Sequence, residues 1–273
     1  MNQAGKKLSV CIICMNEAKT IERCLQSVAF ADEIVILDSG STDATLEIAR
    51  QYTDKIYSRK DWEGFGIQRQ RAEQLASHDW IFAIDCDEVV SSLLKDEIRA
   101  RLDQAKDGDV IRVNRLTNFC GHLIRHSGWY PDYVDRIYNR NQYGYNDKIV
   151  HESVNCKAAR KITLKQDLLH YQFDDLFLYI NKRNRYAESG ANEKLKNHKS
   201  ASLSRAVTAS LTAFIKHYLL KRGFLDGRIG FVIAVIQMQY TFNKYLFLTY
   251  KNTPSAATKD GVDPQPHSTR TTP

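Results

Sequence analysis

The chain has 273 residues, of which 43% are hydrophobic, so it can bury a full core. It contains no run of about 18 apolar residues, and a helix that spans a membrane is therefore not expected. The net charge of +7 is unevenly divided, because residues 1–110 carry 14 Lys/Arg against 20 Asp/Glu and residues 111–273 carry 25 against 12. The basic part should face nucleic acid, a membrane surface or a phosphorylated acceptor, unless it is simply a solvated basic face.

The six cysteines lack the spacing of a disulfide framework, which favours a reduced, cytosolic protein. Cys11 and Cys14 form a Cys-x-x-Cys, but they lie inside the apolar run 8–14, which has the character of a strand. Residues three apart on a strand face opposite ways, so we expect buried free thiols here and no metal site. The short polar segment Met1–Lys7 does not have the pattern of a signal peptide.

Apolar strands alternate with helical segments along the first third of the chain. The strands are expected at 8–14, 33–37, 55–58 and 80–84. Helical segments are expected at 21–28, from a cap at 41–43 through about 52, and at 67–77. This alternation predicts an α/β fold with a mainly parallel sheet, right-handed crossovers and helices on both faces.

The pattern changes after the fourth strand. A helix is expected at 93–102, and strands at 110–115, 133–138 and 164–171. The strand at 133–138 alternates and should be half exposed, and 150–154 should be a short extended segment. We therefore expect a second, mixed part of the sheet that carries a substrate-facing region.

The C-terminal part reads as a helical extension with a tail. A helix is expected at 176–196 and an amphipathic helix with basic flanks at 205–222, and 231–250 carries a second apolar stripe. Such faces fit a helix in a membrane interface, or a helix that packs on the catalytic domain. Residues 252–273 hold four of the five prolines and should be disordered. The predicted organisation is a catalytic domain at 1–172, with halves at 1–110 and 111–172, an extension at 173–251 and the tail.

Polar residues follow three of the predicted strands. They are Asn16 and Glu17, then Asp38 and Asp43, and then Asp85 and Asp87. The ends of parallel strands share one edge of the sheet, where ligands bind, so these residues predict a nucleotide-sized pocket. Asp85 and Asp87 should project to the same side and suit a divalent cation that also binds phosphate oxygens. An acidic turn or helix cap is the alternative.

These motifs resemble glycosyltransferase family 2, the inverting enzymes with the GT-A fold. The resemblance covers about residues 8–172 and is carried by Cys14-Met15-Asn16-Glu17, Asp38-Ser39-Gly40-Ser41-Thr42-Asp43, Arg69 and Asp85-Cys86-Asp87-Glu88. A narrower likeness, to the β-1,4-glucosyltransferases of the lipopolysaccharide inner core, is carried by Gly128–Asp132, Arg136, Val150–Glu152 and Gly223–Gly227 with Gly230-Phe231.

Roles for the donor site follow from this resemblance and from side-chain chemistry. Asn16 and Glu17 can hydrogen-bond to uracil and ribose edges, and the resemblance places Asp38 on the uridine. Arg69 would neutralise the diphosphate or brace the base pocket. Asp87 would bind Mg²⁺ or Mn²⁺, and Asp85 would hold the ribose or a metal-bound water.

A late histidine serves as a metal ligand in many GT-A enzymes, and His170 at the end of a predicted strand is the candidate here. A structural histidine is the alternative.

Inversion needs one base on the acceptor side, and Glu152 is the candidate. An ion pair of Glu152 with the basic part of the chain is the alternative, and Asp132 and Asp135 are fallback bases. His151 should point to the opposite face of the segment. Two further residues are candidates for acceptor or phosphate contacts, namely Trp129 and Arg136, although Arg136 could instead pair with its neighbour Asp135.

The resemblance implies a metal-dependent inverting transferase that moves a sugar, glucose by the narrower likeness, from a UDP-sugar to the heptose/Kdo inner core of lipopolysaccharide. It would work as a peripheral protein on the cytoplasmic face of the inner membrane, without nucleic acid. Transfer to a polyprenyl phosphate or to a protein is the alternative on the same fold. A nucleotide- or nucleic-acid-binding regulator is the alternative from another class, although acidic strand ends would repel nucleic acid.

Overall fold

The computed structural model describes residues 5–173 and 175–251. The chain divides into two compact units, Met1–Leu176 and Phe177–Pro273, against a predicted boundary at 172. The predicted disordered tail at 252–273 lies outside the described residues.

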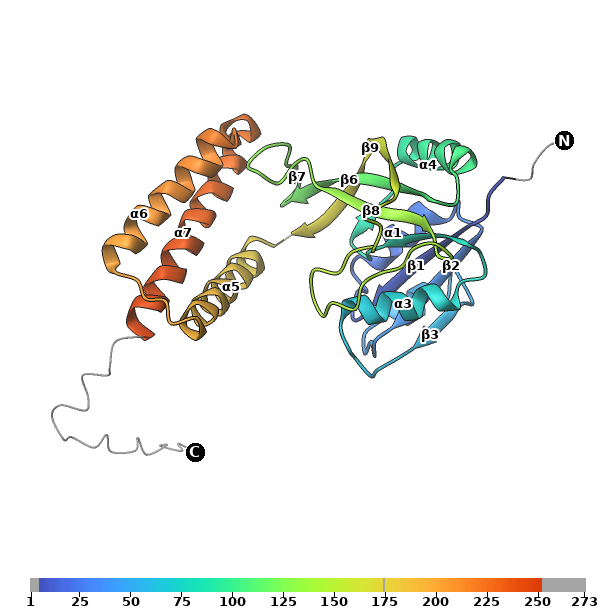
Figure 1. Ribbon diagram of the computed structural model, residues 1–273, viewed down its shortest axis with the longest axis horizontal. Coiled ribbons are helices and arrows are strands. Elements are labelled where there is room, and N and C mark those ends of the chain that lie inside the picture. The colour runs from blue at the N-terminus through green and yellow to red at the C-terminus, as the bar shows by residue number, and fades with distance from the viewer. Residues whose placement is uncertain (1–4, 174, 252–273) are drawn as a thin grey trace, which may run out of the picture. The chain divides into compact units, whose positions relative to one another are not determined.

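The first unit is built on one sheet of mixed direction (Figure 1). Its elements are β1 (Leu8–Cys14), α1 (Ile21–Val28), β2 (Glu33–Asp38), α2 (Thr45–Ala49), β3 (Ile56–Ser58), α3 (Phe65–Leu75), β4 (Trp80–Ile84), β5 (Glu88–Val89), α4 (Ser92–Gln104), β6 (Asp109–Phe119), β7 (His122–Leu123), β8 (Tyr133–Asn139) and β9 (Arg160–Phe173). The strand order is β3-β2-β1-β4-β8-β6-β9-β5, with β7 paired to β6.

The sheet combines a parallel part with a mixed part, as predicted. Strands β3, β2, β1 and β4 are parallel. Strand β8 is antiparallel to both β4 and β6, β9 is parallel to β6, and β5 is antiparallel to β9. The α/β class of the prediction is confirmed.

Two apolar clusters cover the two faces of the sheet. One joins alternate residues of β1 and β4 to α1 and α4, and the other joins the intervening residues to α3. Cys14 belongs to the first cluster and Cys11 to the second, so the Cys-x-x-Cys residues face opposite ways. All six cysteines lie within the described residues and are free thiols, as predicted.

Three local predictions were wrong or inexact. Helix α2 ends at Ala49, earlier than expected. The strand at 133–138 is exposed only at its start, because its second half is buried between β4 and β6. The segment 150–154 is irregular, and only Val154 forms an isolated bridge, with Tyr145. His151 has a positive φ of 59°, which breaks the extended conformation that was expected around it.

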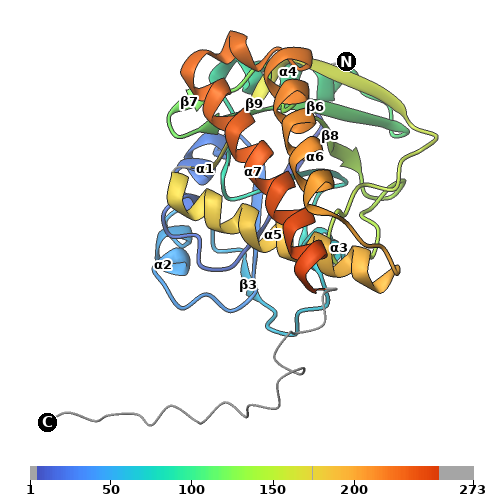
Figure 2. The same ribbon diagram turned by 90° about the vertical axis from the view of Figure 1, so that its left-hand side faces the viewer.

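The second unit is helical. It contains most of α5 (Leu176–Lys196), followed by α6 (Leu203–Ile215), a π-helical turn (Lys216–Leu220), a 3₁₀ turn (Gly223–Asp226) and α7 (Gly227–Lys251). Helices α6 and α7 run side by side (Figures 1 and 2). Helix α5 is tied to α7 by polar contacts, such as the 2.8 Å hydrogen bond that Arg183 donates to Gln237. Every helix of the described residues is too short or too polar to span a bilayer.

Glycines attach an irregular segment, residues 146–153, to the start of α3. The N–H groups of Phe65 and Gly66 donate to the carbonyls of Ile149 and Lys148, at 3.1 and 3.0 Å. A Cβ at Gly66 would lie 2.0 Å from the carbonyl oxygen of Asn146, closer than any real contact. Only glycine permits this approach, so Gly66 determines where the segment lies.

A buried carboxylate joins the first strands at the opposite end from the polar strand ends. Glu33 contacts Ser9 and Lys55, and it accepts hydrogen bonds at 2.7 Å from the backbone N–H and the hydroxyl of Ser77. Burial raises the pKa of Glu33, but these donors outweigh it and lower the pKa from 4.5 to about 2.

We expect Glu33 to make the free energy of unfolding depend on pH in the acid range. Because its pKa is lower in the folded chain, its carboxylate stabilises the fold above pH 4.5, and that stabilisation is lost as the pH falls towards 2. When the pH falls over this range, the free energy of unfolding should decrease by about 2 kcal/mol less in Glu33→Gln than in the wild type. Urea denaturation at each pH measures it. The exposed Glu22→Gln should behave as the wild type, and equal acid losses in all three proteins would contradict the assignment.

We expect Gly66→Ala to release the segment 146–153 from α3, because its methyl group overlaps the backbone at Asn146. Limited trypsin digestion should then cleave after Lys148 at least about tenfold faster than in the wild type. The control is Gly108→Ala, where the added Cβ meets only Tyr143 at 3.9 Å. Unchanged cleavage in Gly66→Ala would show that the glycine does not hold the segment.

Candidate active site

A pocket of about 790 Å³ opens at the carboxyl ends of β1, β2 and β4. Six of the predicted site residues line it, namely Glu17, Arg69, Asp85, Asp87, Glu152 and His170. They come from the ends of β1 and β4, from α3, from the irregular segment 146–153 and from β9. The sheet edge expected to bind a ligand therefore does carry a concave polar site.

The loops after β1 and β2 are tied together beside this pocket. Asn16 accepts a hydrogen bond from the N–H of Thr42 at 2.8 Å, and the N–H of Asn16 donates to Ser41 at 2.9 Å. The N–H of Glu17 donates to Thr45 at 2.8 Å. The first two predicted polar clusters are thus neighbours, as expected, and Glu17 faces the pocket, where burial raises its pKa.

Asp38 and Asn16 do not line the pocket in this structure. Asp38 is only 2% exposed, and its carboxylate accepts the N–H groups of Gly40 and Ser41 at 2.9 and 3.0 Å. It shapes the turn after β2, in which Gly40 has a positive φ of 109°. The roles of Asn16 and Asp38 on the uridine stay predictions.

Asp85 lies between two buried arginines. One of its oxygens contacts Arg69, and the other lies 2.6 Å from Nη2 of Arg136. Burial raises the pKa of Asp85, but the charges of Arg136 and Arg69 outweigh it and hold the pKa well below its usual range. Asp85 is therefore an ionised carboxylate of fixed orientation at the end of β4.

Glu88 holds both Asp85 and Arg136 in place. It is fully buried, its Oε1 lies 2.5 Å from Nη2 of Arg136, and its Oε2 accepts the N–H of Asp85 at 3.0 Å. Arg115 approaches the same carboxylate at 3.5 Å. The motif alone assigns Glu88 no role, because only tertiary contacts bring Arg136 of β8 beside the acidic turn.

The alternative weighed for Arg136, a pair with its neighbour Asp135, is not formed, and its contact with the acceptor or phosphate stays a prediction. Arg136 is 4% exposed and bonds to Asp85 and Glu88. Asp135 points to the other side of β8, where it pairs with Arg112 at 2.8 Å and Lys161 at 2.6 Å. Neighbours on a strand face opposite ways, which explains the separation.

Asp87 and His170 come together on the other side of the acidic turn. Nε2 of His170 lies 3.3 Å from Oδ2 of Asp87. The antiparallel pairing of β5 with β9 sets Glu88 opposite His170, and the N–H of Tyr171 donates to the carbonyl of Asp87 at 2.8 Å. Backbone pairing thus places an imidazole beside the second carboxylate of the Asp-x-Asp motif.

These two side chains suit a shared divalent cation, and the metal role of Asp85 stays a prediction. Both oxygens of Asp85 are engaged by guanidinium groups, whereas Asp87 and His170 present one oxygen and one nitrogen within a few ångströms of each other. Across residues 5–173 and 175–251, no cluster of three or more His, Cys, Asp or Glu side chains is placed to hold a metal alone. A cation here would complete its coordination with ligand oxygens or water.

Glu152 enters the pocket from the irregular segment 146–153. Its Oε1 accepts a hydrogen bond from Nε of Arg69 at 3.0 Å, and 17% of its side chain is exposed. The ion pair weighed as an alternative therefore exists, but its partner is Arg69 in the pocket wall and not the basic C-terminal part of the chain. Arg69 joins Glu152 to Asp85 across the site.

The fallback bases and the predicted aromatic contact lie elsewhere. Asp132 is paired with Arg115 at 2.7 Å, and neither Asp132 nor Asp135 lines the pocket. Trp129 packs edge-to-face against Phe119 with ring centroids 5.4 Å apart, and it does not line the pocket either.

Several lining residues carry no recognisable motif. They are the cations Lys60 and Arg115 and the exposed aromatic residues Trp62 and Phe65. Trp62 and Phe65 meet edge-to-face at 4.8 Å. Only folding shows that these residues line one pocket.

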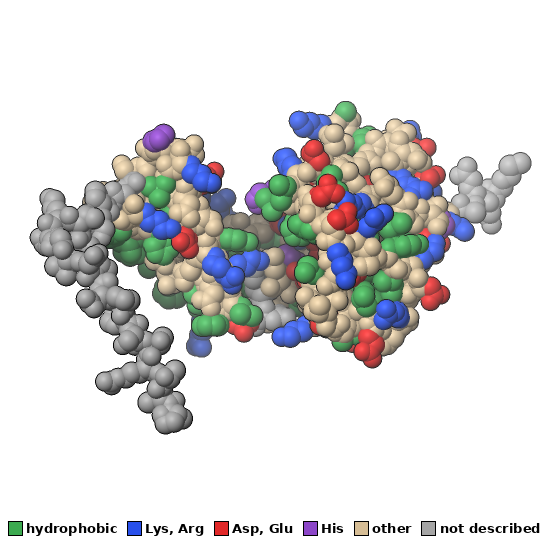
Figure 3. All heavy atoms as spheres, turned by 90° about the horizontal axis from the view of Figure 1, so that it is seen from below, with side chains coloured by type: hydrophobic (Ala, Val, Ile, Leu, Met, Phe, Trp, Pro, Cys, Tyr) green, Lys and Arg blue, Asp and Glu red, His purple; other side chains and the backbone are tan. Residues whose placement is uncertain are grey.

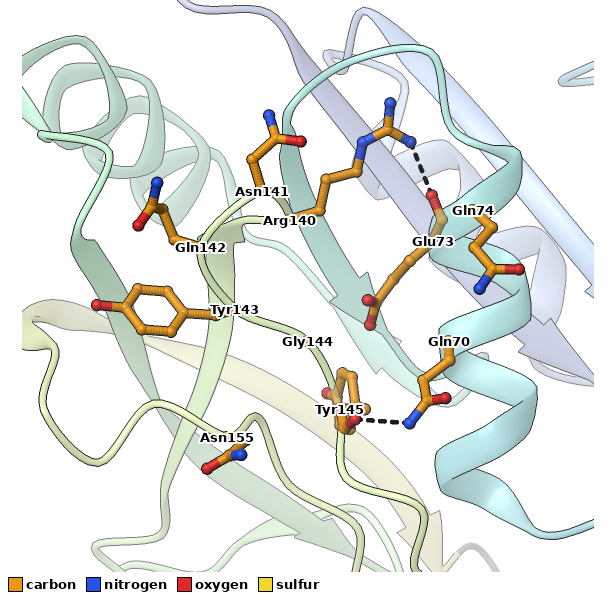
Figure 4. Close-up of a pocket in the computed structure, with 10 residues that line it drawn as sticks. All are labelled: Gln70, Glu73, Gln74, Arg140, Asn141, Gln142, Tyr143, Gly144, Tyr145 and Asn155. Atoms are coloured by element: carbon orange, nitrogen blue, oxygen red, sulfur yellow. Dashed lines mark hydrogen bonds between the residues drawn. The ribbon is translucent and has the colours of Figure 1, made fainter.

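A second hollow of about 710 Å³ lies beside α3 and contains none of the predicted site residues (Figure 4). Two of its side chains donate hydrogen bonds to backbone carbonyls. Gln70 donates to the carbonyl of Tyr145 at 2.7 Å, and Arg140 donates to the carbonyl of Glu73 at 2.9 Å. Burial raises the pKa of Glu73 to about 7. The ring of Tyr145 also contacts Arg69, 5.0 Å from its guanidinium carbon, so this hollow supports the wall of the active pocket.

Comparison with known proteins agrees with these motifs. The family described as "Glycosyl transferase family 2" matches residues 9–167. An uncharacterized glycosyltransferase of Rickettsia bellii (strain RML369-C) is 33% identical over 89% of this chain and 85% of its own length. "Lipopolysaccharide core biosynthesis glycosyltransferase LpsC" of Rhizobium meliloti (strain 1021) is 28% identical over 86% of this chain and 89% of its own length.

Among solved structures, glucosyl-3-phosphoglycerate synthase from Mycobacterium tuberculosis, in complex with Mg²⁺ and UDP, aligns at 26% identity. The alignment covers 42% of this chain and 44% of that one, with a TM-score of 0.34. The matched family covers more than half of the chain and the Rickettsia relative aligns along most of it, so this protein belongs to glycosyl transferase family 2 and is a glycosyltransferase.

Proposed function

We propose that the protein is a metal-dependent inverting glycosyltransferase that moves glucose from UDP-glucose to the heptose/Kdo inner core of lipopolysaccharide. The observation that carries the proposal is the meeting of Asp87, His170, Asp85 and Glu152 around one pocket at the sheet edge. The acceptor class is supported by the similarity to LpsC, whose name assigns it to lipopolysaccharide core biosynthesis. Such an acceptor would place the enzyme at the cytoplasmic face of the inner membrane.

The donor would lie between the β1 and β2 ends and the acidic turn. Glu17 faces the space proposed for the uridine. Lys60 and Arg115 supply positive charge in the pocket wall, which suits a diphosphate. Asp87 and His170 would hold Mg²⁺ or Mn²⁺, which when bound supplies positive charge that stabilises the departing diphosphate. Asp85, held by two arginines, would orient the ribose or a sugar hydroxyl.

Glu152 would accept the proton of the attacking acceptor hydroxyl. It lies at the edge of the pocket on a segment separate from the acidic turn, so it can contact the acceptor while the donor occupies the other wall. Arg69 holds its carboxylate in place through the 3.0 Å hydrogen bond. A positioned carboxylate within hydrogen-bond reach of the hydroxyl is what inversion requires.

We expect Asp87→Ala to lower the rate of transfer at least about 100-fold, because the charge that holds the cation is removed. The measurement is release of UDP from UDP-glucose with Mn²⁺ and a truncated lipopolysaccharide acceptor. Addition of a chelator should bring the wild type down to the level of the variant. Asp96→Ala, at an exposed position of α4, is the matched control, and normal turnover by Asp87→Ala would refute the metal assignment.

We expect Glu152→Gln to bind UDP-glucose as the wild type does but to transfer at least about 100-fold more slowly, because the amide cannot accept the proton. Calorimetry measures binding, and the same UDP-release assay measures transfer. The control is Glu63→Gln, whose carboxylate is 61% exposed and pairs with Arg71. Normal transfer by Glu152→Gln would place the base elsewhere.

The acceptor class needs a separate test, in which polyprenyl phosphate and protein acceptors are compared with the truncated lipopolysaccharide in the same UDP-release assay.

A further inference from the structure

The second unit presents a row of exposed apolar side chains. Four of them recur at every fourth residue of α6, and the π-helical turn continues the row. They are Leu203, Val207, Leu211, Ile215 and Leu219, each between 43% and 54% exposed. The turns that follow add Leu220 at 74%, Leu225 at 54% and Phe224 at 47%. We call these eight residues the α6 apolar surface.

The opposite side of α6 already has a partner. Ala206 and Ser210 are buried on α6, and Ala234 and Ile233 are buried on the neighbouring α7. Gly230 approaches so closely that a Cβ there would lie 1.9 Å from the carbonyl oxygen of Gly223. The α6 apolar surface is therefore not the face by which α6 packs against α7. Large apolar residues grouped on one exposed face mark a surface that contacts something else.

An aromatic cluster makes the end of this surface rigid. The ring of Tyr218 lies 5.4 Å from that of Phe214, 5.7 Å from Phe231 and 6.4 Å from Phe224. These contacts join α6, both turns and the start of α7 into one packed tip. Leu219, Leu220 and Leu225 project from a preformed structure, so their burial by a partner would need little ordering.

The charges around the surface are almost all positive. Residues 203–231 contain five Lys/Arg and a single acid, Asp226. Lys216, Lys221, Arg222 and Arg228 are exposed, and within the described part of the chain none of them forms a salt bridge. The whole stretch 177–251 carries 13 Lys/Arg against three Asp/Glu. Figure 3 shows basic and apolar side chains with few acidic ones on the visible face of this helical unit.

We infer that the α6 apolar surface and its four surrounding cations dock on an anionic phospholipid bilayer. The apolar side chains would enter the acyl boundary while the cations meet lipid phosphates, as in helices that lie in a membrane interface. A second copy of this chain fits less well, because a two-fold contact would bring the same unpaired cations of both copies together. Docking on the bilayer would bring the enzyme to the membrane that carries the proposed acceptor. Only this connection with the acceptor rests on the proposed function.

The test is flotation of the full-length protein with vesicles of phosphatidylcholine alone or with roughly 30 mol% phosphatidylglycerol. The wild type should float with the anionic vesicles and stay unbound with the neutral ones. The double variant Leu219→Glu/Leu220→Glu should bind at least about tenfold more weakly, as should Lys216→Ala/Lys221→Ala. Leu93→Glu, at a position of α4 that is 64% exposed, should bind as the wild type does.

Two further measurements make the outcome decisive. Circular dichroism must show unchanged helix content in each variant, which is expected because all substituted side chains are exposed. Equal binding by the wild type and both double variants, or no binding by the wild type, would overturn the inference. So would a wild-type dimer that the Leu219→Glu/Leu220→Glu variant disrupts without any vesicle binding. The assay contains neither donor nor acceptor, and transfer to a delipidated acceptor is measured separately, so failure of docking and failure of the proposed function are distinguishable.

Discussion

The active pocket depends on one buried set of charges, the pairing of Asp85 with Arg69 and Arg136 above Glu88. Glu88, Arg69 and Arg136 are buried, and the side chain of Asp85 is 29% exposed, so the buried groups are stable only while their charged partners are present. Removing one would leave an uncompensated charge. The network therefore fixes the end of β4, and the hydrogen bond from Arg69 also holds the carboxylate of Glu152.

Rigid backbone pairing surrounds this network and sets the remaining geometry. The short pairing of β5 with β9 brings His170 to Asp87, although the two residues are far apart in sequence. The close approach at Gly66 seats the segment that carries Glu152. Each device holds a residue of an irregular segment, Asp87 in the turn after β4 and Glu152 in 146–153, against a regular strand or helix. The site thus combines a proposed metal pair, Asp87 and His170, with a proposed base, Glu152, which Arg69 links to Asp85.

The two units differ in charge as their proposed tasks differ. In the first unit the acids gather at strand ends, where a metal and a nucleotide diphosphate would bind. The second unit has an excess of cations and an exposed apolar row on α6. A transferase that acts on a lipid-linked, phosphorylated acceptor would need both properties, one for chemistry and one for location.

The sequence by itself determined the α/β class, the strand at Trp80–Ile84, the polar strand ends and the Asp-x-Asp motif, because strand burial and strand-end chemistry are local and periodic. It also indicated His170 through resemblance, and Glu152 through the need for a base on the acceptor side. It did not determine the partners of those residues. Arg136 and Glu88 come from different strands, and their pairing depends on β8 inserting beside β4 in antiparallel register. The irregular course of residues 150–154 likewise depends on a distant glycine, Gly66. Only the tertiary structure decided these contacts, because they join segments whose separation along the chain carries no periodic signal.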